Sequence, residues 1–176
     1  METQPTAHEK TKALEDWFVA NGGHFRKDIQ LSHSDSIGLH LRASKDIRPG
    51  STTASAPHSL ALSYLNALVD DRYPVFRKQR QRFKCEAIGF WYLAFQYLDR
   101  KRSFWGPYLE SLLCPEDAAN EGTQPMFWER EEDMRWLRGT DVWHTVSARK
   151  EVYWGYYNDG LTILDAAGMN VGSVTW

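Results

Sequence analysis

The hydrophobic period of the amino-acid sequence changes from two to about 3.6 near Ser59, and this change limits the possible folds more than any other feature. Before it, Ile29, Leu39 and Leu41 alternate with polar neighbours, which is the period of two typical of half-buried strands. After it, apolar residues recur every three or four positions, which is the period of an α-helix. We therefore predict an α+β chain, with a small β region between about Ile29 and Ser55 and helices nearly everywhere else.

A short amphipathic helix is expected ahead of the β region, from Ala7 to Ala20. Thr6 and Glu9 have the spacing of a capping box, in which a hydroxyl and a carboxylate satisfy the first free N–H groups of a helix. The sequence Asn21-Gly22-Gly23 follows, and glycine accepts the left-handed conformation that ends helices. These signals predict both ends of the helix.

Turn residues divide the β region. Ser32–Ser36 supply a first turn between two predicted strands, and the Pro49-Gly50 pair supplies a second. Ser51–Ser55 then predict a third strand.

The predicted helices after Ser59 differ in how much of their surface is apolar. Leu62, Leu65, Leu68 and Val69 form one apolar stripe on a helix capped by Ser59 or Ser63. The segment Cys85–Leu98 is apolar almost all round, which predicts burial on most sides. Gly89 inside this segment costs about 1 kcal/mol against alanine, and we interpret it as a point of close contact with a neighbouring element.

The C-terminal third of the sequence alternates between polar stretches and helical patterns. Pro115–Gln124 is polar and acidic, and predicts a loop, whereas Trp128–Arg138 predicts a helix that Gly139 ends. Helical spacing resumes at Val142 and is expected to break at Asn158-Asp159-Gly160, with a new apolar segment from Leu161. We expect this last segment to be poorly packed.

Charge and composition argue against several partners. The formal net charge of the 176 residues is -2, so no overall positive field attracts nucleic acid or an anionic membrane. The single basic run, Arg77–Lys84, is interpreted as a solvated linker or helix face. The start lacks the apolar stretch of a signal peptide, and the longest apolar run, Ala87–Phe95, is far shorter than the roughly 20 residues of a membrane span. We expect an intracellular protein, cytoplasmic or nuclear.

Other chemistry-bearing residues have more ordinary interpretations. His33, Asp35 and His40 match no metal-ligand spacing, and the two cysteines form no ligand pair, so we predict no metal site. The acids of 129–133 are expected to favour a helix N-terminus. The eight tryptophans are expected mainly in the core, although a sugar-binding or single-stranded nucleic-acid surface is the alternative.

Three groups of motifs carry a resemblance to a known family. Gly38–Gly50 resembles the opening of SET domains, where a G-x-G-L-x-A strand precedes a DI-x-x-G turn. Pro57–Ser63 resembles the P-x-x-L-A-L-S/T stretch that leads into the helical insert of Rubisco large-subunit methyltransferase and its relatives. Ser103–Leu112, Met126–Glu129 and Leu137–Thr140 are similar, in order, to three further motifs of that insert. Together the motifs extend over roughly residues 38 to 140.

The resemblance implies an S-adenosylmethionine-dependent protein-lysine N-methyltransferase that acts on a protein with a target lysine. It also implies that Ile37, Gly38 and Leu39 give backbone contacts to the methyl donor, with glycine allowing close approach. Two departures concern this same site. His40 stands where the second glycine of the strand motif is usual, and Ile37 stands where relatives often carry an acidic residue.

The family's catalytic half follows its helical insert, with an Asn-His pair and a tyrosine beside the lysine channel. No Asn-His pair follows Thr140, and Tyr153, Tyr156 and Tyr157 lie in an aromatic helical run without the expected context, so no catalytic residue is assigned. The implied division is a lead-in over 1–28, SET strands over 29–58 and a helical insert over 59–176. We expect a fragment that lacks the C-terminal SET half and is inactive by itself. The alternative is a non-catalytic helical module that binds protein.

Overall fold

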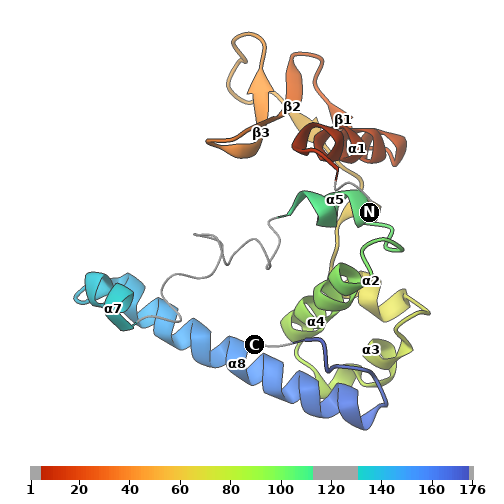
Figure 1. Ribbon diagram of the computed structural model, residues 1–176, viewed down its shortest axis with the longest axis vertical. Helices are drawn as coiled ribbons and strands as arrows, with labels where there is room; N and C mark the ends of the chain where they lie inside the picture. The colour runs from red at the N-terminus through yellow and green to blue at the C-terminus, as the bar shows by residue number, and fades with distance from the viewer. Residues whose placement is uncertain (1–4, 113–130, 175–176) are drawn as a thin grey trace. The chain divides into compact units, whose positions relative to one another are not determined.

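The computed structural model describes residues 5–112 and 131–174, and it has the predicted α+β class (Figure 1). Its contacts divide it into two compact units, each formed from two stretches of chain. Unit 1 comprises residues 5–62 and 99–112, and unit 2 comprises residues 63–98 and 131–174 of the described chain.

Unit 1 contains one longer helix, two small antiparallel sheets and a short second helix. Its elements are α1 (Ala7–Ala20), β1 (His24–Phe25), β2 (Ile29–Ser34), β3 (Gly38–Ala43), β4 (Ala54–Ser55), the 3₁₀ turn η1 (His58–Leu60) and α5 (Gly106–Ser111).

Helix α1 has the predicted bounds because both ends carry strong local signals. The Thr6 hydroxyl accepts a hydrogen bond from the Glu9 N–H at 3.3 Å, and the Thr6 N–H donates to the Glu9 carboxylate at 2.7 Å. This is the predicted capping box. At the other end Gly22 has a φ of +85°, a conformation that favours glycine.

The β region is a hairpin beside a minimal second sheet. β2 pairs with β3 from Ile29 opposite Ala43 to Ser34 opposite Gly38, so the hairpin turn is shorter than the predicted Ser32–Ser36. Residues 24–25 of β1, which the sequence did not predict, pair with β4. The predicted third strand, Ser51–Ser55, was too long, since only its last two residues pair.

The unit 1 core forms where α5 packs on α1 and on the segment around η1. Trp105, immediately before α5, is 5% exposed and donates its indole N–H to the Leu60 carbonyl at 3.0 Å. Phe104 contacts Trp17 of α1 edge to face, with ring centroids 5.6 Å apart. Leu109 of α5 is buried against these elements. Residues more than 40 positions apart therefore close this unit.

Unit 2 is helical throughout its described part. Its elements are α2 (Tyr64–Val69), α3 (Pro74–Lys78), η2 (Arg80–Arg82), α4 (Cys85–Leu98), α7 (Glu131–Met134), η4 (Arg135–Leu137) and α8 (Asp141–Ala166). Helix α4 has the predicted bounds and packs against α2 and α8. Its buried residues are Ala87, Ile88, Trp91, Tyr92, Phe95 and Gln96.

Burial of α4 on most sides was a wrong prediction. Phe90 and Leu98 are each 47% exposed, because α2 and α8 cover only part of the helix surface among the described residues. The predicted stripe of α2 was also wrong. Ala67 is the buried position, whereas Leu65 and Val69 are 59% and 72% exposed. Ser63 caps this helix, as one of the two predicted candidates.

Helix α8 continues through Asn158-Asp159-Gly160, where a break was predicted (Figure 1). Gly160 is buried, and a methyl group added there would lie 2.5 Å or less from ring atoms of Trp91 on α4. Gly89 was expected at such a contact, but its nearest neighbour, Tyr64, lies 3.9 Å from a Cβ built there. The segment after Leu161 is better packed than predicted, since Ile163 and Leu164 are 5% and 0% exposed.

The stretch before α8 is described only in part. Of the predicted helix Trp128–Arg138, residues 131–137 form α7 and η4, and Gly139 follows with a φ of +83°. The predicted loop Pro115–Gln124 lies outside the described residues. Across residues 5–112 and 131–174, no helix has both the length and the apolar composition that a membrane crossing requires.

Candidate functional site

The three residues predicted to contact a methyl donor lie together where the hairpin turn enters β3. Ile37 is 70% exposed, and its N–H donates to the Ser34 hydroxyl at 3.3 Å. Gly38 begins β3, and Leu39 is half-buried and pairs with His33 across the hairpin. Ile37, Gly38 and Leu39 are therefore consecutive residues at the turn end of the hairpin, with Ile37 exposed.

Gly38 has the two properties that a close backbone contact requires. Its φ of +72° favours glycine over residues with a side chain. Within the described part of the chain, and apart from the two adjacent residues, no heavy atom lies within 4 Å of the position that a Cβ would take, so the backbone there faces open space. His40, which replaces the usual glycine, lies with its Nδ1 2.9 Å from the Gly38 carbonyl oxygen, where the Nδ1–H tautomer donates a hydrogen bond. This contact occupies one acceptor position of the Gly38 carbonyl oxygen.

The surface beside Gly38 is the open edge of a β-sheet. In the described chain, β2 and β3 form a two-stranded sheet, so the outer edge of β3 has no neighbouring strand there. Unpaired N–H and C=O groups on such an edge can bind a ligand or a further strand. Among the described residues, no group of three or more histidine, cysteine or acidic side chains is placed to hold a metal ion.

A separate apolar hollow lies within unit 1, with a volume of about 460 Å³. Side chains of α1 line one side of it, including Leu14, Trp17 and Phe18, and the segment 56–62 lines another. The Trp17 indole N–H is buried and has no hydrogen-bond partner among the described residues. Neither Gly38 nor its two neighbours line this hollow.

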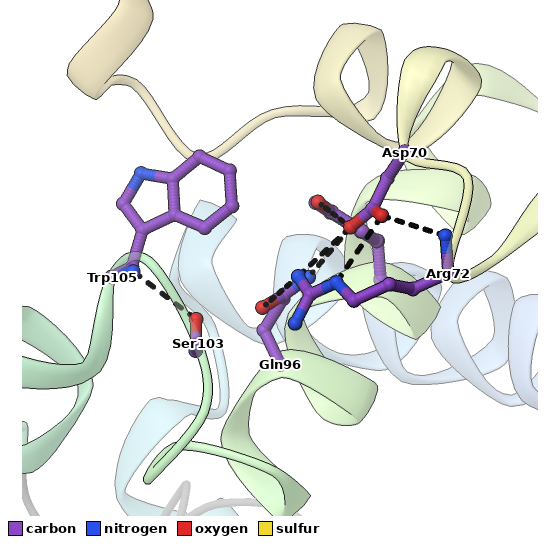
Figure 2. Close-up of polar contacts among 6 residues, drawn as sticks. Asp70, Arg72, Gln96, Ser103 and Trp105 are labelled. Carbon is purple, nitrogen blue, oxygen red and sulfur yellow. Dashed lines mark hydrogen bonds and ion pairs between the residues drawn. The ribbon is translucent and has the colours of Figure 1, made fainter.

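A partly buried polar network joins the end of α2 to α4 in unit 2 (Figure 2). The Asp70 carboxylate accepts hydrogen bonds from the Tyr92 hydroxyl at 2.8 Å and the Gln96 amide at 3.2 Å. It also accepts from the Arg72 guanidinium at 2.9 Å, and Figure 2 shows this group reaching both Asp70 and Gln96. Figure 2 also draws a separate contact of unit 1, in which the backbone N–H of Trp105 donates to the Ser103 hydroxyl.

The network keeps its groups in their ordinary charge states at neutral pH. Burial opposes ionisation of Asp70, but hydrogen bonds from Arg72 outweigh it and hold the pKa of that carboxyl below its usual range. Burial, and then the bond to Asp70, raises the pKa of the Tyr92 hydroxyl. Tyr92 therefore stays neutral and does not serve as a proton acceptor. We interpret the network as a structural link between α2 and α4.

Helices α4 and α8 enclose a second apolar space in unit 2, which we call the aromatic hollow. Its volume is about 350 Å³ and its lining residues are Phe90, Trp91, Ala94, Tyr153, Tyr156, Tyr157 and Val174. Phe90 meets Tyr153 edge to face with centroids 5.2 Å apart, and Trp91 stacks on Tyr157 at 5.8 Å. The Trp91 N–H donates to the Tyr156 carbonyl at 3.1 Å, which links α4 to α8 through two of the lining residues.

Positive charge borders the aromatic hollow. Lys84, just before α4, lies with its Nζ 5.5 Å from the centroid of the Tyr156 ring. Four more cations precede it on α3 and η2, and we call this group the basic turn: Arg77, Lys78, Arg80 and Arg82. All four are exposed, and they surround a hollow of about 560 Å³ with Gln79 and Gln81. The interpretation of this run as a solvated helix face agrees with its exposure.

No protein-family model matches the sequence, and the search of the curated proteins found no match. The SET resemblance therefore stays a prediction that depends on the motifs quoted above.

Sequence reasoning missed both the polar network and the aromatic hollow. Tyr153, Tyr156 and Tyr157 were noted as an aromatic run, and this run was the signal available for the hollow, but the sequence does not show which residues of α4 it meets. Asp70 and Gln96 gave no signal, because the sequence does not show that the end of α2 meets the last turn of α4, 26 residues away.

Proposed function

We propose that this chain is the N-terminal part of a SET-domain protein-lysine methyltransferase of the Rubisco large-subunit methyltransferase-like family. In this proposal Ile37, Gly38 and Leu39 contribute backbone contacts to S-adenosylmethionine. The helical segments of unit 2 belong to the insert that borders the protein substrate. The observation that carries the proposal is Gly38, whose positive φ and open surroundings occur at the motif position where close approach of the cofactor is expected.

The residues present fit one side of a cofactor site. Gly38 has no side chain that would block approach of the cofactor, and the outer edge of β3 offers backbone donors and acceptors. S-adenosylmethionine, when bound, supplies a methyl group on a positively charged sulfur, which a neutral lysine amine can attack. Ligand sites usually bury most of the ligand surface. The hairpin alone does not do so, and the proposal assigns the remaining contacts to the C-terminal SET half.

An NMR titration of the purified chain with S-adenosylmethionine tests the half-site. We expect binding weaker than about 1 mM, with amide shifts concentrated at Ile37, Gly38 and Leu39. A tritium-transfer assay on mixed protein extract should stay at background, since the proposal assigns to the C-terminal SET half the residues that hold a lysine in line with the methyl group. Turnover would contradict the proposed division of the site.

A matched pair of variants separates ligand contact from backbone strain. Gly38→Val and Gly50→Val both place a β-branched residue at positive φ, +72° and +78° in turn, and both glycines face open space. We expect Gly38→Val to remove the amide shifts and Gly50→Val to keep them. Equal responses of the two variants, or shifts absent from residues 37–39 at saturating ligand, would refute the cofactor assignment.

A non-catalytic module that binds protein is the second candidate, and exposed apolar side chains of unit 2 favour it. Trp136 is 82% exposed and Trp154 is 47% exposed. Reading the coding sequence after Trp176 distinguishes the two candidates. An in-frame continuation with an Asn-His pair and a tyrosine motif supports the methyltransferase, whereas a stop codon supports the module.

A further inference from the structure

We propose that unit 2 binds an acidic peptide segment that carries one large apolar anchor side chain. The anchor enters the aromatic hollow, and the carboxylates on one side of it pair with Lys84 and the basic turn. This surface is independent of methyl transfer, and it would serve a methyltransferase or a non-catalytic module equally.

The charge of the basic turn is local and unbalanced. The whole chain has a formal net charge of -2, yet residues 77–84 contain five lysines and arginines and no acid. Arg77 pairs with Asp71 at 3.3 Å, and both side chains are more than half exposed, so the pair is weak. In the described chain, no carboxylate forms an ion pair with Lys78, Arg80 or Arg82. These cations are therefore available for an acidic partner.

The aromatic hollow has the size and lining for an anchor side chain. Its volume of about 350 Å³ accommodates one phenylalanine, leucine or tryptophan side chain. Its walls are aromatic rings and aliphatic groups, and one polar group on its rim, the Tyr157 hydroxyl, already donates to the Val174 carbonyl at 3.1 Å. Protein interfaces often concentrate their binding energy in one such buried anchor.

Lys84 connects the two features. Its Nζ lies 5.5 Å from the Tyr156 ring that lines the hollow, and it ends the run of cations that begins at Arg77. A carboxylate paired with Lys84 would therefore lie at the rim of the hollow. Acidic residues next to the anchor in sequence would reach Lys84, and more distant ones would reach Arg82 and Arg80.

The ring geometry favours a peptide over nucleic acid. Single-stranded nucleic acid needs exposed ring faces on which successive bases stack. Here the Phe90 ring meets Tyr153 at 80°, and Trp91, whose face is stacked on Tyr157, is 3% exposed. The rings form the walls of one space, which suits a single inserted side chain.

Fluorescence anisotropy with the full chain tests the surface. The probe is a labelled peptide that alternates glutamate and serine around one central phenylalanine. We expect a dissociation constant below about 100 μM at low salt, with weaker binding at high salt. Replacing the phenylalanine by serine should weaken binding about tenfold or more, because the anchor contributes by apolar burial.

Charge-reversal variants locate the site. Arg80→Glu with Arg82→Glu should weaken binding about tenfold or more, and both residues are exposed, so the thermal melt should not change. The matched control is Arg42→Glu with Arg48→Glu, two exposed arginines of unit 1, which should bind like the parent chain. Absence of peptide binding, equal binding of the serine peptide, or equal losses in the two double variants would overturn the proposal. Tighter binding of an oligothymidylate of equal charge would overturn it in favour of nucleic acid.

Discussion

Substitution of Gly160 by alanine should destabilise unit 2, although alanine is the better helix former. The added methyl group would overlap the indole ring of Trp91, which is only 3% exposed and cannot move aside freely. Overpacking of this kind costs about 2 kcal/mol. Displacing the ring also breaks the bond from its N–H to the Tyr156 carbonyl, at about 2 kcal/mol for a buried donor. Alanine recovers about 1 kcal/mol of helix propensity, so the expected net loss is about 3 kcal/mol.

Gly155 provides the matched control, because it lies in the same helix and, in the part of the chain that the structure describes, no atom outside its own helical turn lies within 4 Å of its Cβ position. Gly155→Ala should stabilise the helix by about 1 kcal/mol. Thermal unfolding followed by far-ultraviolet circular dichroism measures both variants. Gly160→Ala should lower the melting temperature by roughly 5–10 °C, and Gly155→Ala should raise it by about 2–4 °C. A melting temperature for Gly160→Ala equal to or above that of Gly155→Ala would refute the packing argument.

Three further substitutions test other parts of the fold. Thr6→Ala removes the cap of α1 and should cost about 1 kcal/mol in the free energy of unfolding, measured by urea titration. Trp105→Phe leaves the Leu60 carbonyl without its donor and should cost about 1–3 kcal/mol by the same method. Asp70→Asn should cost about 1 kcal/mol at pH 7, a modest value because its partner Arg72 is 43% exposed. The folded pKa of Asp70 lies below its unfolded value. The stabilisation by the carboxylate is therefore present above about pH 4 and is lost as the pH falls through the folded pKa. The unfolding free energies of the parent and Asp70→Asn chains should accordingly become equal in acid. An unchanged difference at low pH would contradict the role of the carboxylate.

Local signals predicted the fold well wherever they were sufficient. The bounds of α1 follow from a capping box and a glycine end, and those of α4 follow from a continuous apolar run. Predictions failed where tertiary contacts decide. Residues of the types in Asn158-Asp159-Gly160 are poor helix formers and predicted a break. Packing of Gly160 on the Trp91 ring instead stabilises a continuous α8. Likewise, the four apolar residues of the predicted stripe could not reveal that Ala67, rather than Leu65, is the buried position of α2.

The candidate sites show the same limit. The position of Gly38 at the start of β3 follows from its place after a turn, and its resemblance to a family motif directed attention to it. The aromatic hollow depends on α4 and α8, whose contacting residues are about 65 positions apart. The sequence contains the aromatic residues, but nothing in their spacing determines which face of α8 meets α4.

The closure of unit 1 by Trp105 and α5 has a consequence for the newly made chain. Helix α1 leaves the ribosome early, but α5, which covers its apolar face, begins only at Gly106. At about 5–20 residues per second, the interval between the end of α1 and the start of α5 is roughly 4–17 seconds. During this time Trp17 lacks its native contact with Phe104, which is made just before α5. A chaperone that recognises short apolar helices would therefore meet this protein before its first unit can finish folding.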